Sequence, residues 1–295
     1  MTQIFGVPTV ALYAQLVLGL VNGCFYAILS LGLALIFGML NITNFAHGAF
    51  YMMGAVFSWI ALAHFGIGYW WALLLAPLLV AVLGIVVERT LLQWLYKVDS
   101  LYGLLLTFGL ALVIEGLFRY RYGVSGLPYS PPESFQGALN LGFMFLPKYR
   151  AWVVLVSLVT CFSTWFVIEW TPLGAYLRAA TENPKLVQAF GINVPVMITL
   201  TYAAGIGLAG LAGVLAAPAT QISPLMGTNL IIVVFAVVVI GGMGSILGSI
   251  STGLGLGLIE GLTKVYYPQA SDTVVFLIMA LVLLVRPAGL FGKER

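Results

Sequence analysis

Residues 10–40, VALYAQLVLGLVNGCFYAILSLGLALIFGML, form an apolar run that is interrupted mainly by Gln15 and Asn22. A helix that crosses a bilayer needs about 20 largely apolar residues, and this run exceeds that length. It is also far longer than the apolar core of a secretory signal peptide, which is about 7–15 residues. Residues 1–8 contain no Lys or Arg. We therefore interpret the run as a membrane helix of the mature chain and not as a cleaved leader.

The composition of the chain excludes a soluble globular domain. Hydrophobic residues make up 62% of the 295 positions and charged residues only 7%, whereas a soluble domain carries roughly 25% charged residues. The net charge of +3 comes from 12 Lys and Arg against 9 Asp and Glu, which is too sparse for a nucleic-acid-binding surface. Cys24 and Cys161 both lie in apolar runs, without the spacing of a metal site. We expect contact with a lipid bilayer and no nucleic-acid partner.

Apolar segments of membrane-spanning length recur along the whole chain. Their count is eight or nine, because the first is long and the region 229–262 is interrupted by the glycine-rich Gly241–Gly244. The alternation typical of a membrane β-barrel is missing. The sequence therefore predicts an all-α integral membrane protein, a polytopic bundle of 8–9 transmembrane helices. The candidate segments lie near residues 11–39, 48–65, 69–87, 101–118, 151–169, 195–217, 229–243, 246–262 and 272–286.

The polar stretches are too short for a second domain and long enough to indicate orientation. The two longest have about 30 and 25 residues, which cannot bury a core, so we expect one transmembrane domain over residues 1–295. Lys and Arg concentrate in cytoplasmic loops. With nine spans, three basic segments fall on one side, the predicted cytoplasm, and the N-terminus falls outside. The loop 119–150 disagrees, because its flanks are basic and it is placed outside; the three agreeing segments outweigh it. They carry Arg89 and Lys97, Arg178 and Lys185, and Arg286, Lys293 and Arg295.

The polar segment 171–194 predicts two short helices. Thr171 followed by Pro172 is typical of a helix N-cap with proline at the first helical position, and Asn183 followed by Pro184 repeats this pattern. Gly191 is a suitable stop. The helices, about 172–182 and 184–190, are too short to span a bilayer. They suit either insertion of apolar anchors into a partner's groove or an interfacial position on lipid headgroups. The anchors would be Leu177, Leu186, Val187 and Phe190.

The segment Asn41–Gly48 concentrates polar residues between two apolar runs. Asn41, Asn44 and His47 either dip into the bundle, where they would line a solute path, or lie in a turn at the membrane surface. The match of the segment's edges to the ends of two spans favours the surface turn. His47 has no partner at ligand spacing, so a metal site is not expected.

Glycines and small residues indicate close helix packing and exclude an ATP-binding loop. The glycine-rich Gly241–Gly248 is not followed by Lys-Ser/Thr, and the phosphate-loop pattern occurs nowhere in the chain. Small residues four apart on one face let helix backbones approach in lipid. The segment Gly241–Gly244 is also a candidate for a flexible helix break. The small-residue series are Gly205, Ala209, Gly213 and Ala217, and Ser249, Gly253, Gly257 and Gly261.

Two acids lie within apolar segments and argue against ion coupling. Glu115 and Glu260 each precede a base by four residues, Arg119 and Lys264, which is the favourable order for a helical ion pair. We expect both acids to be structural, because a proton relay needs unpaired carboxylates. Asn22 either bonds between helices or faces solute. No catalytic constellation is present in the sequence, so we do not expect an enzyme.

Several motifs together resemble one family of transport permeases. Arg178-Ala179-Ala180 with Gly191 is similar to the EAA-type coupling loop of ABC importer permeases, although Arg178 stands where many members have an acid. The branched-chain amino acid (Liv-type) permeases share that departure. Their signatures also resemble Asn22–Ile28, Asn41–Gly48, Gly241–Gly248 and Arg286–Gly292, so the resemblance covers nearly the whole chain. Urea-type permeases are close relatives, and the motifs do not separate the two groups.

The resemblance implies a subunit of an ATP-driven importer in the bacterial inner membrane. Its implied partners are a second homologous permease, two cytoplasmic ATP-binding subunits that carry ATP and Mg, and a periplasmic substrate-binding protein; no cofactor is implied for this chain. Short cytoplasmic coupling helices would contact the ATPase through Arg178, Ala179, Ala180, Glu182, Asn183 and Gly191. The candidate substrate path comprises Asn22, Asn41, Asn44, His47, Gly241 and Gly242. The alternatives are a urea-type or other small-solute ABC permease and a stand-alone ion-coupled secondary transporter.

Overall fold

The computed structural model describes residues 3–4, 7–40, 43–96 and 98–292. Seven of the helices in this part of the chain are long and apolar enough to cross a membrane. They are α1 (Thr9–Leu40), α2 (Ala46–Phe65), α3 (Tyr69–Thr90), α4 (Ser100–Tyr122), α5 (Lys148–Trp170), α8 (Val194–Ala216) and α10 (Ile246–Tyr266). The apolar helices α9 (Met226–Gly241) and α11 (Val274–Val285) have 16 and 12 residues, fewer than the roughly 20 of a straight crossing. The predicted polytopic helical membrane protein is therefore confirmed.

The remaining elements are short. Two helices, α6 (Pro172–Glu182) and α7 (Pro184–Ala189), follow α5 directly. Two antiparallel hairpins pair β1 (Gln3–Ile4) with β2 (Val7–Pro8) and β3 (Ala138–Asn140) with β4 (Phe145–Pro147). Single 3-10 turns occupy Leu92–Leu95, Glu133–Phe135 and Pro268–Ala270.

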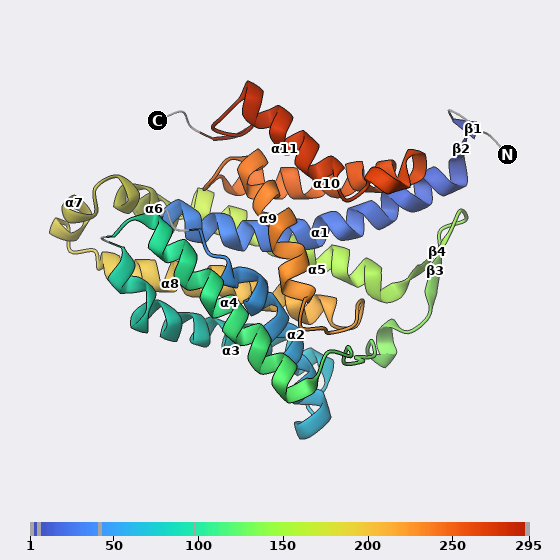
Figure 1. The fold of residues 1–295 in the computed structure, drawn as a ribbon, viewed down its shortest axis with the longest axis horizontal. Helices are drawn as coiled ribbons and strands as arrows, with labels where there is room; N and C mark the ends of the chain where they lie inside the picture. Colours follow the sequence, from blue (N-terminus) through green and yellow to red (C-terminus); the bar gives the residue numbers. More distant parts are fainter. Residues whose placement is uncertain (1–2, 5–6, 41–42, 97, 293–295) are drawn as a thin grey trace.

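Helix α1 lies inside the bundle and packs along α10 and α8 (Figure 1). Glycines meet across these contacts. A Cβ atom added to Gly257 would lie 2.3 Å from the Cα of Gly23, and one added to Gly205 would lie 2.6 Å from the carbonyl oxygen of Gly32. The helix backbones therefore touch, which is how helices associate where lipid removes the hydrophobic drive between them. The packing predicted from the small-residue spacing is confirmed.

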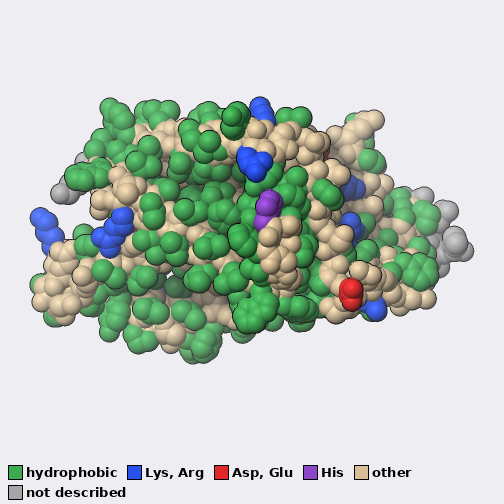
Figure 2. All heavy atoms as spheres, turned by 90° about the horizontal axis from the view of Figure 1, so that it is seen from below, with side chains coloured by type: hydrophobic (Ala, Val, Ile, Leu, Met, Phe, Trp, Pro, Cys, Tyr) green, Lys and Arg blue, Asp and Glu red, His purple; other side chains and the backbone are tan. Residues whose placement is uncertain are grey.

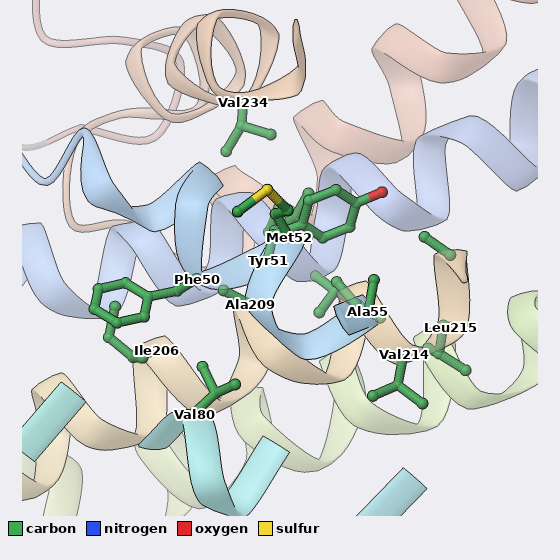
Figure 3. Packing of buried hydrophobic residues seen from close by; sticks show 14 of the residues in the cluster. Phe50, Tyr51, Met52, Ala55, Val80, Ile206, Ala209, Val214, Leu215 and Val234 are labelled. Atoms are coloured by element: carbon green, nitrogen blue, oxygen red, sulfur yellow. The ribbon is translucent and has the colours of Figure 1, made fainter. Parts of the chain in front are cut away.

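Helix α2 packs between α8 and α9. Phe50, Tyr51 and Met52 are at most 3% exposed, and they lie between Ile206 of α8 and Val234 of α9 (Figure 3). Burying an aliphatic or aromatic side chain contributes about 1.5–3 kcal/mol to stability when the alternative is exposure to water. In lipid, van der Waals packing between the helices provides the stabilisation instead. The position of α2 thus joins two helices that are distant from it in the sequence.

The connecting segments gather at two ends of the bundle (Figure 1). One end carries α6 and α7 together with the last turns of α1, α3 and α11, and we call it the α6–α7 end. The opposite end carries the start of α1 and the β3–β4 hairpin. The segments with Arg89, Arg178 and Arg286 share the α6–α7 end, as the nine-span alternation predicts, while Lys97, Lys293 and Arg295 lie outside the described residues.

The outer surface suits a hydrocarbon environment. Leu74 and Leu78 on α3, Leu117 on α4 and Phe162 on α5 are each more than 60% exposed. Hydrophobic side chains cover most of the face shown in Figure 2, and charged side chains are sparse on it. An apolar surface of this extent marks contact with a membrane or with another protein.

Candidate functional site

Local signals place α6 and α7 as predicted, with one change at the first cap. Asn183 caps α7, since its Oδ1 accepts a hydrogen bond from the amide of Leu186 at 3.0 Å. Gly191 ends the pair with a φ of +83°, a conformation that favours glycine. Thr171 precedes Pro172 at the N-cap position, yet its hydroxyl donates to the carbonyl oxygen of Val167 and does not cap α6. Proline at the first helical position explains why the helix starts there regardless.

The residues assigned to coupling by resemblance divide into exposed and buried ones. Ala179, Glu182 and Asn183 are exposed, as is Gly191. Ala180 is only 6% exposed and packs with Val187 and Val194, in contact with Met39 of α1. Ala180 therefore fastens the helix pair to the bundle.

Arg178 contacts the end of α5. Its guanidinium lies 3.5 Å from the Glu169 carboxylate, with both side chains about half exposed, and its Nη1 donates to the carbonyl oxygen of Ile168 at 3.4 Å. Gly174 allows α6 to approach the end of α5 closely, because an added Cβ atom would lie 1.6 Å from the same carbonyl oxygen. Gly174 was missed in the sequence, although it lies only two residues after Pro172 at the start of the predicted helix.

Two of the four predicted apolar anchors are available to a partner. Leu186 is 55% exposed and Phe190 is 77% exposed. Val187 is buried and Leu177 is partly covered, so the prediction was wrong for these two. They face the bundle because a short helix needs an apolar side toward its own protein as well. Leu173 and Tyr176, at 54% and 44% exposed, extend the free apolar surface along α6.

The segment before α2 lies inside the bundle, so the favoured surface turn was wrong. Asn44 is 1% exposed and His47 is 0% exposed. Asn44 Nδ2 donates to the Tyr202 hydroxyl at 3.1 Å, and its Oδ1 accepts from the amide of Ala46 at 3.1 Å. Non-helical backbone at this depth is tolerated because side chains satisfy it. Asn41 lies outside the described residues.

Two neighbours complete this buried polar segment. His47 Nε2 lies 3.0 Å from the carbonyl oxygen of Leu29, in the middle of α1, and its Nδ1 has no hydrogen-bond partner among the described residues. Thr107 of α4 accepts from the amide of Phe45 at 3.1 Å and donates to the carbonyl oxygen of Thr43 at 3.2 Å. Side chains from α4 and α8 thus hold the start of α2. In the described residues no three His, Cys, Asp or Glu side chains gather as a metal site would need.

A second polar cluster joins α1 to α10. Tyr26 donates to one carboxylate oxygen of Glu260 at 2.6 Å, while Asn22 donates to the other at 3.4 Å. Lys264 Nζ lies 2.5 Å from that second oxygen, so the predicted Glu260–Lys264 pair is confirmed. Asn22 thus bonds between helices, one of its two expected roles. Tyr26 was missed, although its spacing of four from Asn22 places both on one helix face.

The other acids depart from the predicted pattern. Glu115 bonds with the Thr228 hydroxyl of α9, and within the described residues it forms no salt bridge with Arg119. Glu88 is a third buried acid, 2% exposed. It was overlooked in the sequence because the predicted span 69–87 ends one residue before it. Glu88 accepts from Tyr96 at 2.6 Å and from Thr199 at 2.8 Å. Burial and this bond to Glu88 raise the pKa of Tyr96, so the phenol remains a donor.

The described residues of the candidate substrate path therefore lie at three separate places in the bundle and do not form one site. Asn44 and His47 lie within the bundle, Asn22 bonds Glu260 nearer the opposite end, and Gly241 and Gly242 lie at the α6–α7 end.

The family of the chain is shown by its similarity to known proteins. The model of the family described as the branched-chain amino acid transport system permease component matches residues 15–285. The chain belongs to this family.

Relatives of this branched-chain amino acid transport permease match most of its length. It is 29% identical over 294 residues to the high-affinity branched-chain amino acid transport system permease protein LivH of Escherichia coli K12, covering 95% of each chain. It is 30% identical over 292 residues to the corresponding protein BraD of Pseudomonas aeruginosa, again with 95% of each covered. LivM of Escherichia coli K12 is 27% identical, over 92% of this chain and 68% of its own. No solved structure is significantly similar to this chain.

Two motifs of this family member meet in the structure. The amides of Leu290 and Phe291 donate to the carbonyl oxygens of Ile240 and Gly241 at 2.8 and 3.1 Å. Gly242, with a φ of +100°, lets the backbone of Gly292 approach, because an added Cβ atom would lie 2.4 Å from that amide nitrogen. Gly241 and Gly242 are therefore buried beneath the C-terminal segment. They end α9 and pack closely, as the small-residue interpretation predicts. A flexible helix break and a place in the substrate path stay predictions for these two glycines.

Proposed function

We propose that this chain is a permease subunit of an ATP-driven importer for branched-chain amino acids in the bacterial inner membrane. Its 295 residues would form one transmembrane domain, with all nine apolar helices crossing and the α6–α7 end in the cytoplasm. Family membership supports the transport role. The shared end of the three basic segments supports the orientation.

The observation that carries the coupling role is the two-sided character of the α6–α7 pair. Leu186 and Phe190 point away from the bundle, whereas Ala180 and Val187 are buried against it. An exposed apolar pair on a firmly fastened support is suited to insertion into a groove of another protein. The proteins that we propose to bind this surface are two cytoplasmic ATPase subunits, which would bind ATP and Mg.

The contacts of α6 and α7 with the bundle explain how a movement of this helix pair would be transmitted to the membrane helices. Arg178 joins α6 to α5 through Glu169, and Ala180, Val187 and Val194 pack in contact with Met39 of α1. A displacement of the pair therefore moves α1, α5 and α8 together. This is the element that ATP-driven closure would use to alternate access. A second, similar permease of the kind that LivM represents would complete the path, and a periplasmic binding protein would deliver the solute.

The test compares two exposed phenylalanines at opposite ends. Phe190→Ala removes an anchor that is 77% exposed on the α6–α7 end, and the control Phe145→Ala removes one that is 71% exposed on the opposite end. Loss of a central apolar anchor costs more than about 1 kcal/mol, so we expect roughly tenfold weaker ATPase binding for Phe190→Ala. Mild detergent extraction with mass spectrometry measures the associated subunits, and ATP-dependent leucine uptake measures coupling.

Two outcomes would contradict this proposal, and they contradict different parts of it. Extraction of the unaltered chain without any ATPase or second permease, together with ion-driven uptake by the chain alone in liposomes, would overturn the importer. Equal effects of Phe190→Ala and Phe145→Ala would overturn only the placement of the coupling surface.

A further inference from the structure

A cavity of about 410 Å³ opens between α1, α9, α10, α11 and the turn before α11, away from the α6–α7 end. This volume lies within the range of roughly 300–1,000 Å³ for small-molecule pockets. Its wall is part polar and part apolar. The polar part includes Tyr26, Asn229 and Asp272, and the apolar part includes Val233, Val275 and Phe276.

The charge of the cavity is determined by two carboxylates with different surroundings. Glu260 is 6% exposed, and Lys264 lies 2.5 Å from it, so its charge is balanced. Asp272 is exposed, and its side chain accepts only a long hydrogen bond of 3.4 Å from Ser271 among the contacts of the described residues. Asp272 forms no salt bridge within the described residues. Within the part of the chain that the structure describes, the cavity therefore has one negative charge without a cationic partner.

The polar wall does not suit contact with hydrocarbon. Thr228 and Asn229 at the start of α9 are exposed, beside the strongly apolar remainder of that helix. Polar and ionised groups at membrane depth are costly unless they face water, protein or a solute. The apolar wall opposite them, including Ile232 and Phe276, provides a surface for an aliphatic group.

We propose that this cavity binds a solute with a primary ammonium group next to an aliphatic side chain. Asp272 is the ionic partner of the ammonium group, Asn229 is a hydrogen-bonding neighbour, and Val233, Val275 and Phe276 contact the aliphatic part. The inference rests on the proposed transport function and assigns binding residues to it. It requires recognition of the ammonium group, so a solute with the same side chain but no amine should not bind.

The experiment measures protection of an introduced cysteine. Ile232→Cys places a thiol in the cavity wall at a position that is 53% exposed, and the control Leu139→Cys places one at a 40% exposed position on the β3–β4 hairpin. The native Cys24 and Cys161 are 0% and 2% exposed, so their background reaction with a neutral maleimide should be slow. The full chain in liposomes is labelled without ATP, in the presence of L-leucine, 3-methylbutylamine or 4-methylpentanoate. Phe276→Cys serves as a second reporter.

We expect L-leucine and 3-methylbutylamine to slow labelling of both cavity cysteines at least several-fold, and 4-methylpentanoate to leave it unchanged. Asp272→Asn should abolish this protection, whereas the charge-matched control Glu133→Gln, outside the cavity, should retain it. Protection by all three solutes, protection that survives Asp272→Asn, or no protection of either cysteine would each overturn the proposal. ATP-dependent leucine uptake in the assembled transporter would persist in those cases if the proposed function itself is right.

Discussion

Each buried carboxylate of the bundle is held by a donor on another element. Glu260 bonds with Tyr26 of α1, Glu115 with Thr228 of α9, and Glu88 with Thr199 of α8. A buried charge is tolerated only when it is paired or hydrogen-bonded. These acids therefore join helices, and they do not form the chain of free carboxylates that a proton relay needs.

The first prediction concerns Glu115→Gln, because Glu115 lies outside the proposed solute cavity that Glu260 lines. The amide oxygen of glutamine still accepts from Thr228 while the charge is lost. We expect ATP-dependent uptake per inserted chain to fall less than about fivefold, or ~1 kcal/mol. Abolished uptake at normal membrane abundance would instead give this acid a role in ion coupling.

Individual site residues were predictable where their signal is local. Asn183 and Gly191 follow from capping rules, which act within a few positions. The partner of Asn44 is Tyr202, 158 residues away, and no pattern in the sequence connects them. Asp272 was missed because a single acid in a turn between apolar segments is indistinguishable from a solvated loop residue.

At the level of elements, the contact between α1 and α10 depends on backbone proximity. Gly19 and Gly23 of α1 face Gly257 and Gly261 of α10, and the added Cβ atoms would lie closer than 3.3 Å to backbone atoms of the facing helix. A methyl group there must separate the helices. Two positions from Gly257, a Cβ atom added to Gly255 would have no described atom within 4 Å.

The second prediction therefore contrasts Gly257→Ala with Gly255→Ala. Overpacking of a close contact costs about 1–3 kcal/mol, so Gly257→Ala should lower the thermal unfolding temperature in detergent by several degrees. Gly255→Ala should leave it unchanged or slightly higher, because alanine restricts the unfolded chain. Equal melting temperatures for the two variants would contradict the close α1–α10 packing.

The helix boundaries show the same division between local and distant causes. The predicted range 172–182 coincides with α6 because proline at the first helical position defines that start. The start of α2 inside the bundle depends on Thr107 and Tyr202, which belong to α4 and α8. Hydropathy alone marks an edge between spans there, and so it favoured a surface turn.

For the whole molecule, the two ends differ in what they carry. The α6–α7 end gathers the segments with Arg89, Arg178 and Arg286, whereas Arg119 and Arg150 flank the loop toward the opposite end. Basic residues in short loops favour the cytoplasm, and the two sets compete. The three segments at one end prevail in the proposed orientation.

The third prediction tests this orientation and the number of crossings in intact cells. An impermeant thiol reagent should label Leu139→Cys and Tyr267→Cys, and it should label Leu186→Cys and Met243→Cys only after permeabilisation. All four positions are at least 40% exposed. Labelling of Met243→Cys and Tyr267→Cys from one side would show that α10 does not cross, and reversal of all four would invert the chain.

The buried start of α2 has a consequence for how the protein is made. During synthesis, Asn44 and His47 enter the membrane long before Tyr202, the hydroxyl partner of Asn44, has been translated. Until α8 arrives, the polar start of α2 has no stable place in lipid. We therefore expect α2 to wait beside the insertion machinery or at the headgroups, and to settle only when the later helices close around it.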